Sequence, residues 1–327
     1  LPEGGLEGLE LSRYPGIYLH TRSGTLSLPP IHHPVSVLDT LPLPDRSDLP
    51  HSLYQRHWQT KAGCRATSIL ITRGCPFSCD FCSRPVWGDL FRKPSLDRVF
   101  EEIRQILALG YDRLWIADDC FTLDTEFLLS FCRRMIDERL PITWTCLSRV
   151  DRLNRQLAEQ MRDAGCVRVY LGLESGSDQT LQLMGKRTTV ADGISAARLF
   201  HAAGIETAGF FIVGYPGESV ESIESTFSLA LSLPLSSISF NVPLPLPGTP
   251  LFSRVMGDTP MTDWSHANEV RFLYPSEFDE AWLRKRIEDT LEKFRRRRAA
   301  EATEGIDMHD AHREGDGADP DRFGSLI

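Results

Sequence analysis

The chain has 327 residues, enough for one large α/β domain with appendages and a well-buried core. Its net charge is −9 and its pI is about 5.5, so a nucleic-acid partner is not expected. We find no apolar run of about 18 or more residues and no signal-peptide pattern, so we expect no membrane span. Eight cysteines in a chain too large to need disulfides favour the reducing cytoplasm.

The N-terminal part, residues 1–63, is rich in proline and lacks a sustained helical period. We therefore expect a proline-rich extension of extended segments and turns, serving as a linker or covering arm. A short hairpin is predicted from Gly16–His20 and Thr25–Leu28, with Ser23-Gly24 as its turn. The chain begins with Leu1 rather than Met, so we expect it to start partway through a longer product.

From residue 64 onward, short β-rich runs alternate with amphipathic helical periods. Six strands are predicted, at Thr67–Thr72, Arg113–Ala117, Ile142–Leu147, Val167–Gly172, Thr207–Val213 and Ile238–Val242. Helices are expected between them, at about 95–109, from about 125, around 153–161, at 190–203 and around 220–231. Strands that alternate with helices form parallel sheets, so we predict an α/β fold, a partial (β/α)6 TIM-like barrel over residues 64–252. Active sites of such barrels lie at the C-terminal ends of the strands.

Two further parts are expected after the barrel. Residues 243–250 are too proline-dense for a helix or a central strand, so we predict a loop across the barrel mouth. Residues 253–298 are predicted as a C-terminal helical extension, with a packing helix from Phe278 to Arg298. Residues 299–327 are charged and poor in apolar side chains, so we predict a disordered tail.

Three cysteines directly after the first strand have the clearest chemical meaning: Cys75, Cys79 and Cys82. Thiolates this close together can share one metal centre. Structural zinc sites and electron-transfer iron-sulfur clusters normally have four protein ligands, however. Three ligands imply either a distant fourth ligand or an open position where chemistry can occur. The alternatives are a zinc knuckle that borrows Cys64 or Cys120, and three purely structural thiols.

This spacing, with Phe81 just before the last cysteine, resembles that of the radical S-adenosylmethionine (radical SAM) superfamily. The resemblance implies that the three cysteines bind a [4Fe-4S] cluster whose fourth iron is chelated by SAM, with Phe81 beside the cofactor. It further implies reductive cleavage of SAM to a 5'-deoxyadenosyl radical and an external electron donor of the flavodoxin or ferredoxin kind. A metal-binding or iron-sulfur module without SAM chemistry is the non-enzymatic alternative.

Polar motifs follow the second and third predicted strands. Asp118 and Asp119 resemble the family motif that contacts the SAM amino group, and a helix-capping acid pair is the alternative. The family resemblance assigns Arg149 to the SAM carboxylate, because arginine pairs with carboxylates in a bidentate manner. The alternative for Arg149 is an ordinary surface residue.

The fourth and fifth strands also end in family-like segments. Glu174 and Ser175 resemble the segment that contacts the SAM ribose and methionine groups, with helix capping by Ser175 or Ser177 as the alternative. Gly214 lies in a segment that resembles the adenine-binding glycine pattern, although Phe210 replaces its first glycine. A plain strand-to-helix turn is the alternative for Gly214. We assign no catalytic residue beyond these cofactor contacts.

Segments flanking the barrel, among them Leu41–Arg46 and Pro247–Pro250, resemble the cobalamin-dependent members of the superfamily. The resemblance implies a methyltransferase acting on a small metabolite, a peptide or a tetrapyrrole, with cobalamin as a further cofactor. No cobalamin-ligand pattern occurs in the chain, so we expect the cobalamin-binding domain upstream or lost. The alternative is a cobalamin-independent radical SAM cyclase or oxidoreductase. A methylthiotransferase is less favoured, since no RNA-binding β-barrel follows.

Overall fold

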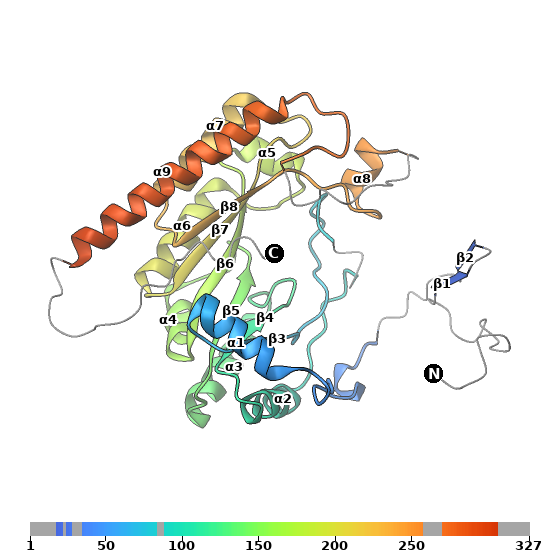
Figure 1. The fold of residues 1–327 in the computed structure, drawn as a ribbon, viewed down its shortest axis with the longest axis vertical. Coiled ribbons are helices and arrows are strands. Elements are labelled where there is room, and N and C mark those ends of the chain that lie inside the picture. Colours follow the sequence, from blue (N-terminus) through green and yellow to red (C-terminus); the bar gives the residue numbers. More distant parts are fainter. Residues whose placement is uncertain (1–17, 22–23, 28–34, 84–87, 258–269, 307–327) are drawn as a thin grey trace.

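The computed structural model describes residues 18–21, 24–27, 35–83, 88–257 and 270–306 (Figure 1). Six parallel strands form one sheet in sequence order: β3 (Ala66–Ile69), β4 (Arg113–Ile116), β5 (Thr143–Ser148), β6 (Cys166–Glu174), β7 (Glu206–Ile212) and β8 (Ser237–Asn241). Within the described residues β3 and β8 do not pair with each other, so the sheet is unclosed. This arrangement confirms the predicted partial barrel.

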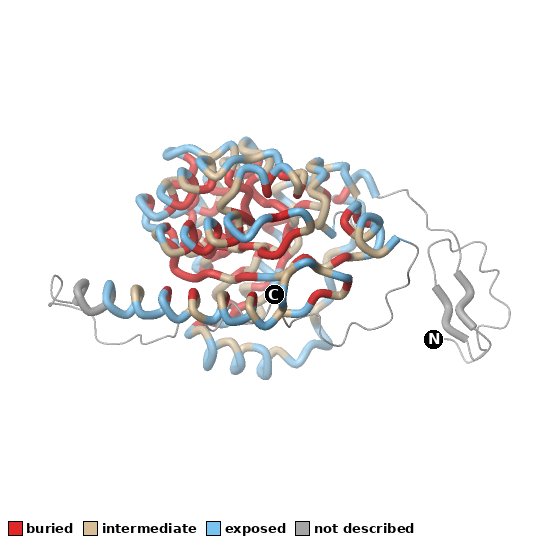
Figure 2. The backbone as a smooth tube through the Cα atoms, turned by 90° about the horizontal axis from the view of Figure 1, so that it is seen from above, coloured by how far each residue is buried: buried red, intermediate tan, exposed pale blue. Residues whose placement is uncertain are grey.

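One face of the sheet carries the hydrophobic core and is covered by the crossover helices α2 (Leu96–Ala108), α3 (Thr125–Glu138), α4 (Arg155–Asp163), α6 (Val190–Ala202) and α7 (Val220–Ser232). Figure 2 shows the buried segments concentrated in the strands and the inner sides of these helices. The largest side chains with no exposed surface include Phe131, Trp144 and Phe211. Full burial of such a side chain contributes roughly 1.5–3 kcal/mol.

Each crossover helix begins at a polar residue that caps it. The side chain of this residue accepts a hydrogen bond from a backbone N–H three positions later, at Ser95, Asp124, Asn154, Thr189 and Ser219. Such a cap satisfies one of the N–H groups that a helix start leaves without a partner. The caps therefore fix where each loop at the C-terminal edge of the sheet ends.

The N-terminal part contains one helix that we did not predict. The expectation of only extended segments and turns in residues 1–63 is wrong for α1 (His51–Ala62), which ends at Gly63 with a φ of 65°. None of its residues is buried, so it has no apolar stripe for a sequence pattern to detect. It is instead held by polar contacts such as the Gln55 amide, which donates to the Leu109 carbonyl at 2.7 Å.

The predicted hairpin is present. Strands β1 (Tyr18–Thr21) and β2 (Gly24–Ser27) pair in antiparallel register, with Thr21 opposite Gly24. Gly24 is therefore the first residue of β2 rather than part of the turn. A short 3-10 helix, η2 (Leu38–Thr40), follows.

The C-terminal part is more helical than predicted. Helix α9 (Glu280–Ile306) packs along α7 (Figure 1), so the disorder predicted for residues 299–327 is wrong for 299–306. Residues 307–327 lie outside the described part. Ion pairs one helical turn apart, such as Arg297 with Glu301 at 3.3 Å, support this end of α9.

Two short helices were also not predicted, α5 (Asp178–Leu183) and α8 (Pro250–Val255). Both consist of only six residues, which is too short to show a helical period. Among the helices that the structure describes, none is long and apolar enough to cross a bilayer.

Candidate functional site

The three cysteines predicted as metal ligands lie on one loop, which follows the C-terminal end of β3. We call residues 73–83 the cysteine loop. Cys75, Cys79 and Cys82 are half-buried, whereas the other five cysteines are buried, and all eight are free. The cysteine loop therefore carries the accessible thiols of the protein.

The start of the cysteine loop is anchored by Asp118, which follows β4. Its carboxylate has no exposed surface and accepts hydrogen bonds from the Ile71 N–H at 2.7 Å, the Thr72 N–H at 2.7 Å and the Thr72 hydroxyl at 2.6 Å. Burial raises the pKa of Asp118 to about 7, against the opposing effect of these hydrogen bonds. The structure thus gives Asp118 a role in positioning the loop, and the SAM contact stays a prediction.

Asp119 lies beside the same loop and is more accessible. Its carboxylate accepts a hydrogen bond from the Gly74 N–H at 3.1 Å, and burial raises its pKa. The alternative role of these acids as helix caps is wrong, because Asp124 caps the following helix α3.

The tip of the cysteine loop is held at Asp80 by two distant segments. The Asp80 N–H donates to the Met184 carbonyl at 2.9 Å, and its carbonyl accepts from the Leu251 N–H at 3.1 Å. The Asp80 carboxylate lies 3.3 Å from the Arg254 guanidinium of α8. Phe81 packs against the small apolar cluster that contains Met184 and Leu251. Sequence analysis missed Asp80, because its partners are far along the chain.

Arg149, after β5, contacts the cysteine loop directly. Its guanidinium carbon lies 3.5 Å from the centre of the Phe77 ring, and its Nε donates to Asp151 at 2.8 Å. Only 8% of Arg149 is exposed, so the alternative of an ordinary surface arginine is wrong. A cation stacked on the cysteine loop suits an anionic cofactor group.

Glu174 ends β6 in a left-handed conformation, with a φ of 62°, and forms a buried ion pair with Lys186. A side chain at Gly172 would place its Cβ 2.6 Å from both charged groups, so it would displace the ends of these two side chains. A register shift between Gly172 and Glu174 turns the Glu174 side chain out of the regular strand pattern. No charge pattern in the sequence connects Glu174 with Lys186, which sequence analysis left without a role.

Ser175 and the following residues form a hydrogen-bonded turn against α7. The Ser175 hydroxyl lies 3.1 Å from the Thr226 hydroxyl and accepts from the Ser177 N–H at 3.1 Å. The Gly176 N–H donates to the Thr226 hydroxyl at 2.8 Å. The cap of α5 is Ser177, so the helix-capping alternative is confirmed for Ser177 and wrong for Ser175.

Gly214, after β7, has a φ of 79° and a Cβ there would lie 2.7 Å from the Phe272 ring. Its N–H and that of Tyr215 donate to one oxygen of the Glu218 carboxylate, at 2.9 and 3.0 Å. Burial raises the pKa of Glu218 to about 7. The turn alternative thus has direct structural support, and adenine contact stays a prediction.

Phe210, which replaces the first glycine of the adenine pattern, lies on the sheet face opposite the core residue Phe211. Its ring stacks on Tyr170 at 5.6 Å, and Tyr170 meets Trp115 edge-on at 4.9 Å. Phe210 and Trp115 are both partly exposed. An aromatic row therefore crosses the open face of the sheet from β4 to β7.

The donor chemistry of the cysteine loop fits an iron-sulfur cluster, because three accessible thiols occur within eight residues. Across the described residues, however, no three His, Cys, Asp or Glu side chains converge as metal ligands do. Cys75, Cys79 and Cys82 are the residues that would hold such a cluster.

Comparisons with known proteins agree with this fold and loop. The family model of the radical SAM superfamily matches residues 69–230. An uncharacterized methyltransferase of Pyrococcus horikoshii is 34% identical over 217 residues, which cover 66% of this chain and 46% of that protein. The anaerobic magnesium-protoporphyrin IX monomethyl ester cyclase of Cereibacter sphaeroides is 33% identical over 214 residues, covering 64% of this chain and 35% of that protein. The chain thus spans less than half the length of these relatives.

Solved structures share the fold. The radical SAM methyltransferase TsrM of Kitasatospora setae, solved with tryptophan substrate and a SAM analog, has a TM-score of 0.64 and 23% identity, covering 76% of this chain and 50% of that one. The cobalamin-dependent radical SAM enzyme OxsB has a TM-score of 0.56 and 21% identity, covering 69% of this chain and 33% of that one. The protein contains an unclosed radical SAM barrel. The chain belongs to the radical SAM superfamily.

Proposed function

We propose that this chain is the radical SAM part of a methyltransferase that binds a [4Fe-4S] cluster through Cys75, Cys79 and Cys82 and cleaves SAM. The observation that carries the proposal is the position of the three accessible thiols at the C-terminal end of β3, where barrel active sites lie. When bound, the cluster and SAM supply the radical chemistry, while the protein binds, orients and excludes water.

The neighbouring strand ends provide polar groups for SAM. We assign Asp119 to the amino group, Arg149 to the carboxylate and Glu174 to the ribose hydroxyls, since a carboxylate accepts hydrogen bonds and a guanidinium donates them. Arg149 touches the cysteine loop through Phe77, which supports its place beside the cluster. The remaining assigned contacts shape the backbone and apolar wall of the site: Phe81, Asp118, Ser175 and Gly214.

The methyl-transfer step is proposed from the relatives. Several of them are named methyltransferases, and the structures that share the fold include enzymes described as cobalamin-dependent. We therefore propose cobalamin as a further cofactor, held by a cobalamin-binding domain outside these residues, and a small-molecule or peptide substrate. An external electron donor of the flavodoxin or ferredoxin kind would reduce the cluster. The free cysteines support a reducing, cytoplasmic location.

A cyclase or oxidoreductase that uses no cobalamin is the second candidate. It is favoured by the relatives named as anaerobic magnesium-protoporphyrin IX monomethyl ester cyclases, one of them 33% identical.

The test is anaerobic reconstitution of the full-length protein with iron and sulfide, followed by reduction in the presence of SAM. We expect 5'-deoxyadenosine to form, and a change in the electron paramagnetic resonance spectrum of the cluster when SAM is added. No spectral change would favour a plain iron-sulfur module. If deoxyadenosine forms but added cobalamin never gives a methylated product from candidate substrates, the methyltransferase part of the proposal fails and the cyclase candidate gains.

A further inference from the structure

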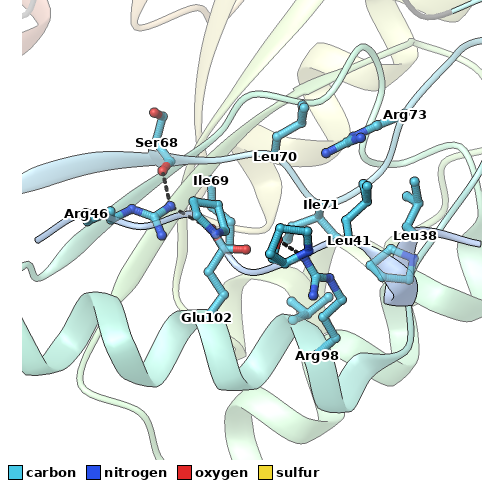
Figure 3. Close-up of a pocket in the computed structure, with 14 residues that line it drawn as sticks. Leu38, Leu41, Arg46, Ser68, Ile69, Leu70, Ile71, Arg73, Arg98 and Glu102 are labelled. Atoms are coloured by element: carbon cyan, nitrogen blue, oxygen red, sulfur yellow. Dashed lines mark hydrogen bonds and ion pairs between the residues drawn. The ribbon is translucent and has the colours of Figure 1, made fainter. Parts of the chain in front are cut away.

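A cavity of about 280 Å³ lies at the free edge of the sheet, beside β3 and the residues that lead from it into the cysteine loop (Figure 3). It is enclosed by three segments: β3 with the residues that follow it, helix α2, and residues 38–46. We call residues 38–46 the N-terminal strap. Nine of the fourteen lining residues are apolar: Leu38, Leu41, Pro42, Pro44, Ile69, Leu70, Ile71, Pro94 and Val99.

The polar part of the wall is strongly cationic. Arg46, Arg73 and Arg98 line the cavity with one carboxylate, Glu102, so three positive charges against one negative leave a net charge of +2. Arg92 and Arg98 lie close enough to Arg73 to lower its pKa, in addition to the lowering by burial. This concentration of cations contrasts with a whole chain of net charge −9.

Arg46 is the residue that points to a ligand. Its side chain is only 12% exposed, and its Nη2 lies 2.6 Å from the Glu102 carboxylate and 3.4 Å from the Ser68 carbonyl. Its other terminal nitrogen, Nη1, is buried and finds no hydrogen-bond acceptor among the described residues. A buried donor without an acceptor costs roughly 1–3 kcal/mol, and more when charged. An anion in the cavity would remove this cost.

Arg98 supplies the second cation on the same side of β3. Figure 3 shows the Arg46, Arg98 and Glu102 side chains together on the α2 side of the strand. Arg98 uses Nη2 to donate to the Pro42 carbonyl of the strap at 2.9 Å. A guanidinium carries five N–H donors, so this contact leaves donors for a further partner.

We propose that this cavity binds a small organic anion, a carboxylate or a phosphate ester whose apolar body packs against the leucines and prolines. The excess of cations and the Arg46 nitrogen without an acceptor favour binding of the anionic group of the ligand, and the apolar wall favours packing of its apolar body. The volume is near the lower end of ligand pockets, roughly 300–1,000 Å³, which suits a ligand of metabolite size. Arg73, which lines the cavity, is the first residue of the cysteine loop, but none of the three cysteines and none of the proposed SAM contacts lines the cavity, so this inference does not depend on the proposed SAM chemistry.

A purely structural explanation makes different predictions. The arginines also hold the strap, through Arg98 to Pro42 and Arg46 to Ser68. If that were their whole role, substituting these arginines would change the thermal stability of the protein, and the wild-type protein would bind no ligand in this cavity.

Isothermal titration calorimetry on the full chain tests the proposal, with phenyl phosphate, benzoate and inorganic phosphate as probes in chloride buffer of matched ionic strength. We expect saturable one-site binding of phenyl phosphate or benzoate, and the tighter of the two identifies the anionic group. The better organic probe should bind roughly tenfold more tightly than inorganic phosphate, because its ring buries apolar surface. Absence of saturable binding by both organic probes would overturn the proposal, as would inorganic phosphate binding as tightly as the better of them.

Two variants separate ligand binding from strap support. Arg98→Gln should lower the affinity for the better organic probe roughly tenfold, since a charge-assisted hydrogen bond is lost. Glu102→Gln should raise the affinity for the same probe several-fold, since the competing carboxylate is removed and Arg46 Nη2 is freed. Arg155→Gln, on the exposed face of α4, is the matched control and should leave affinity unchanged. If Arg98→Gln fails to fold, Glu102→Gln decides alone: unchanged or weaker binding contradicts the proposal.

Discussion

The cysteine loop and the segment from Glu174 to Lys186 lie side by side, but they are held in different ways. The cysteine loop depends on other elements, with Asp118 at its start and Met184, Leu251 and Arg254 at its tip. The segment from Glu174 to Lys186 closes on itself through a buried ion pair, and α7 supports it.

The difference has a functional consequence. A segment with its own buried ion pair and hydrogen bonds can present the Glu174 carboxylate in a fixed place before any ligand arrives. The cysteine loop is instead anchored at its start and at Asp80, which lies between Cys79 and Cys82, and across the described residues its three thiols are not gathered as metal ligands. We therefore expect the Glu174 segment to be rigid and the cysteine loop to be completed by its cluster.

The largest effect should come from removing one thiol of the cysteine loop. We predict that Cys79→Ala abolishes the iron-sulfur absorbance and the SAM-dependent formation of deoxyadenosine after reconstitution, because two thiols cannot hold the cluster. Iron and sulfide content per chain measures the loss. Cys64→Ala removes a buried thiol next to the start of β3 and is the matched control, which should retain the cluster. Equal loss of cluster in both variants would contradict the assignment.

The next largest effect should come from breaking the buried ion pair between Glu174 and Lys186. Lys186→Met leaves the Glu174 carboxylate buried without its partner, so we expect the free energy of unfolding to fall by roughly 3–5 kcal/mol. Urea denaturation measures this change. The double variant Glu174→Gln with Lys186→Met should regain much of the loss, because the buried charge is gone. Arg155→Met breaks a pair whose arginine side chain is 87% exposed, and should cost about 0.5 kcal/mol or less.

The sequence predicted the sheet well because alternating strand and helix periods are local signals. The predicted strand boundaries were wrong where a side chain, rather than a neighbouring strand, accepts the backbone hydrogen bonds. The first strand was predicted to run to Thr72 but ends at Ile69, since the N–H groups of Ile71 and Thr72 donate to the Asp118 carboxylate instead. Helix α1 was missed because polar contacts rather than an apolar stripe hold it.

The site was predictable only in part, for a related reason. Motif spacing placed the cysteines, Asp119 and Glu174 at the ends of three strands, observed as β3, β4 and β6. The partners that hold these groups could not be inferred, because they lie far apart in sequence: Lys186 is 12 residues from Glu174, and Arg254 is 174 residues from Asp80. Pairing at such distances follows from topology, which a motif does not contain.

A third prediction concerns the pH dependence of stability caused by Glu218, whose carboxylate accepts hydrogen bonds from the Gly214 and Tyr215 N–H groups. Burial raises the pKa of Glu218 in the folded protein to about 7, above its ordinary value of 4.5. The folded state therefore binds the proton more tightly, so this stabilisation is fully present below pH 4.5 and is lost as pH rises through about 7. Relative to Glu218→Gln, the wild-type protein should lose about 2.5 kcal/mol of unfolding free energy between pH 5 and pH 8. Denaturation at both pH values measures this, and parallel changes in the two proteins would contradict it.

The smallest expected effect lies at the tip of the cysteine loop. Asp80→Asn removes the charge opposite Arg254 but keeps both backbone hydrogen bonds of residue 80. Because this ion pair is partly exposed, the loss of unfolding free energy should stay below about 1 kcal/mol. The same substitution should let the tip open more often, so alkylation of Cys79 and Cys82 by iodoacetamide should accelerate roughly twofold, as that small free energy allows.

Asp163→Asn, which breaks an exposed ion pair with Arg162, is the control and should leave the alkylation rate unchanged. The comparison with Lys186→Met is the informative one, because that substitution perturbs the rigid neighbour. If alkylation accelerates only when Lys186 is replaced, the tip is held through the Glu174 segment and not through Arg254. If it accelerates only in Asp80→Asn, the tip of the cysteine loop is held by its own ion pair with α8, independently of the Glu174 segment.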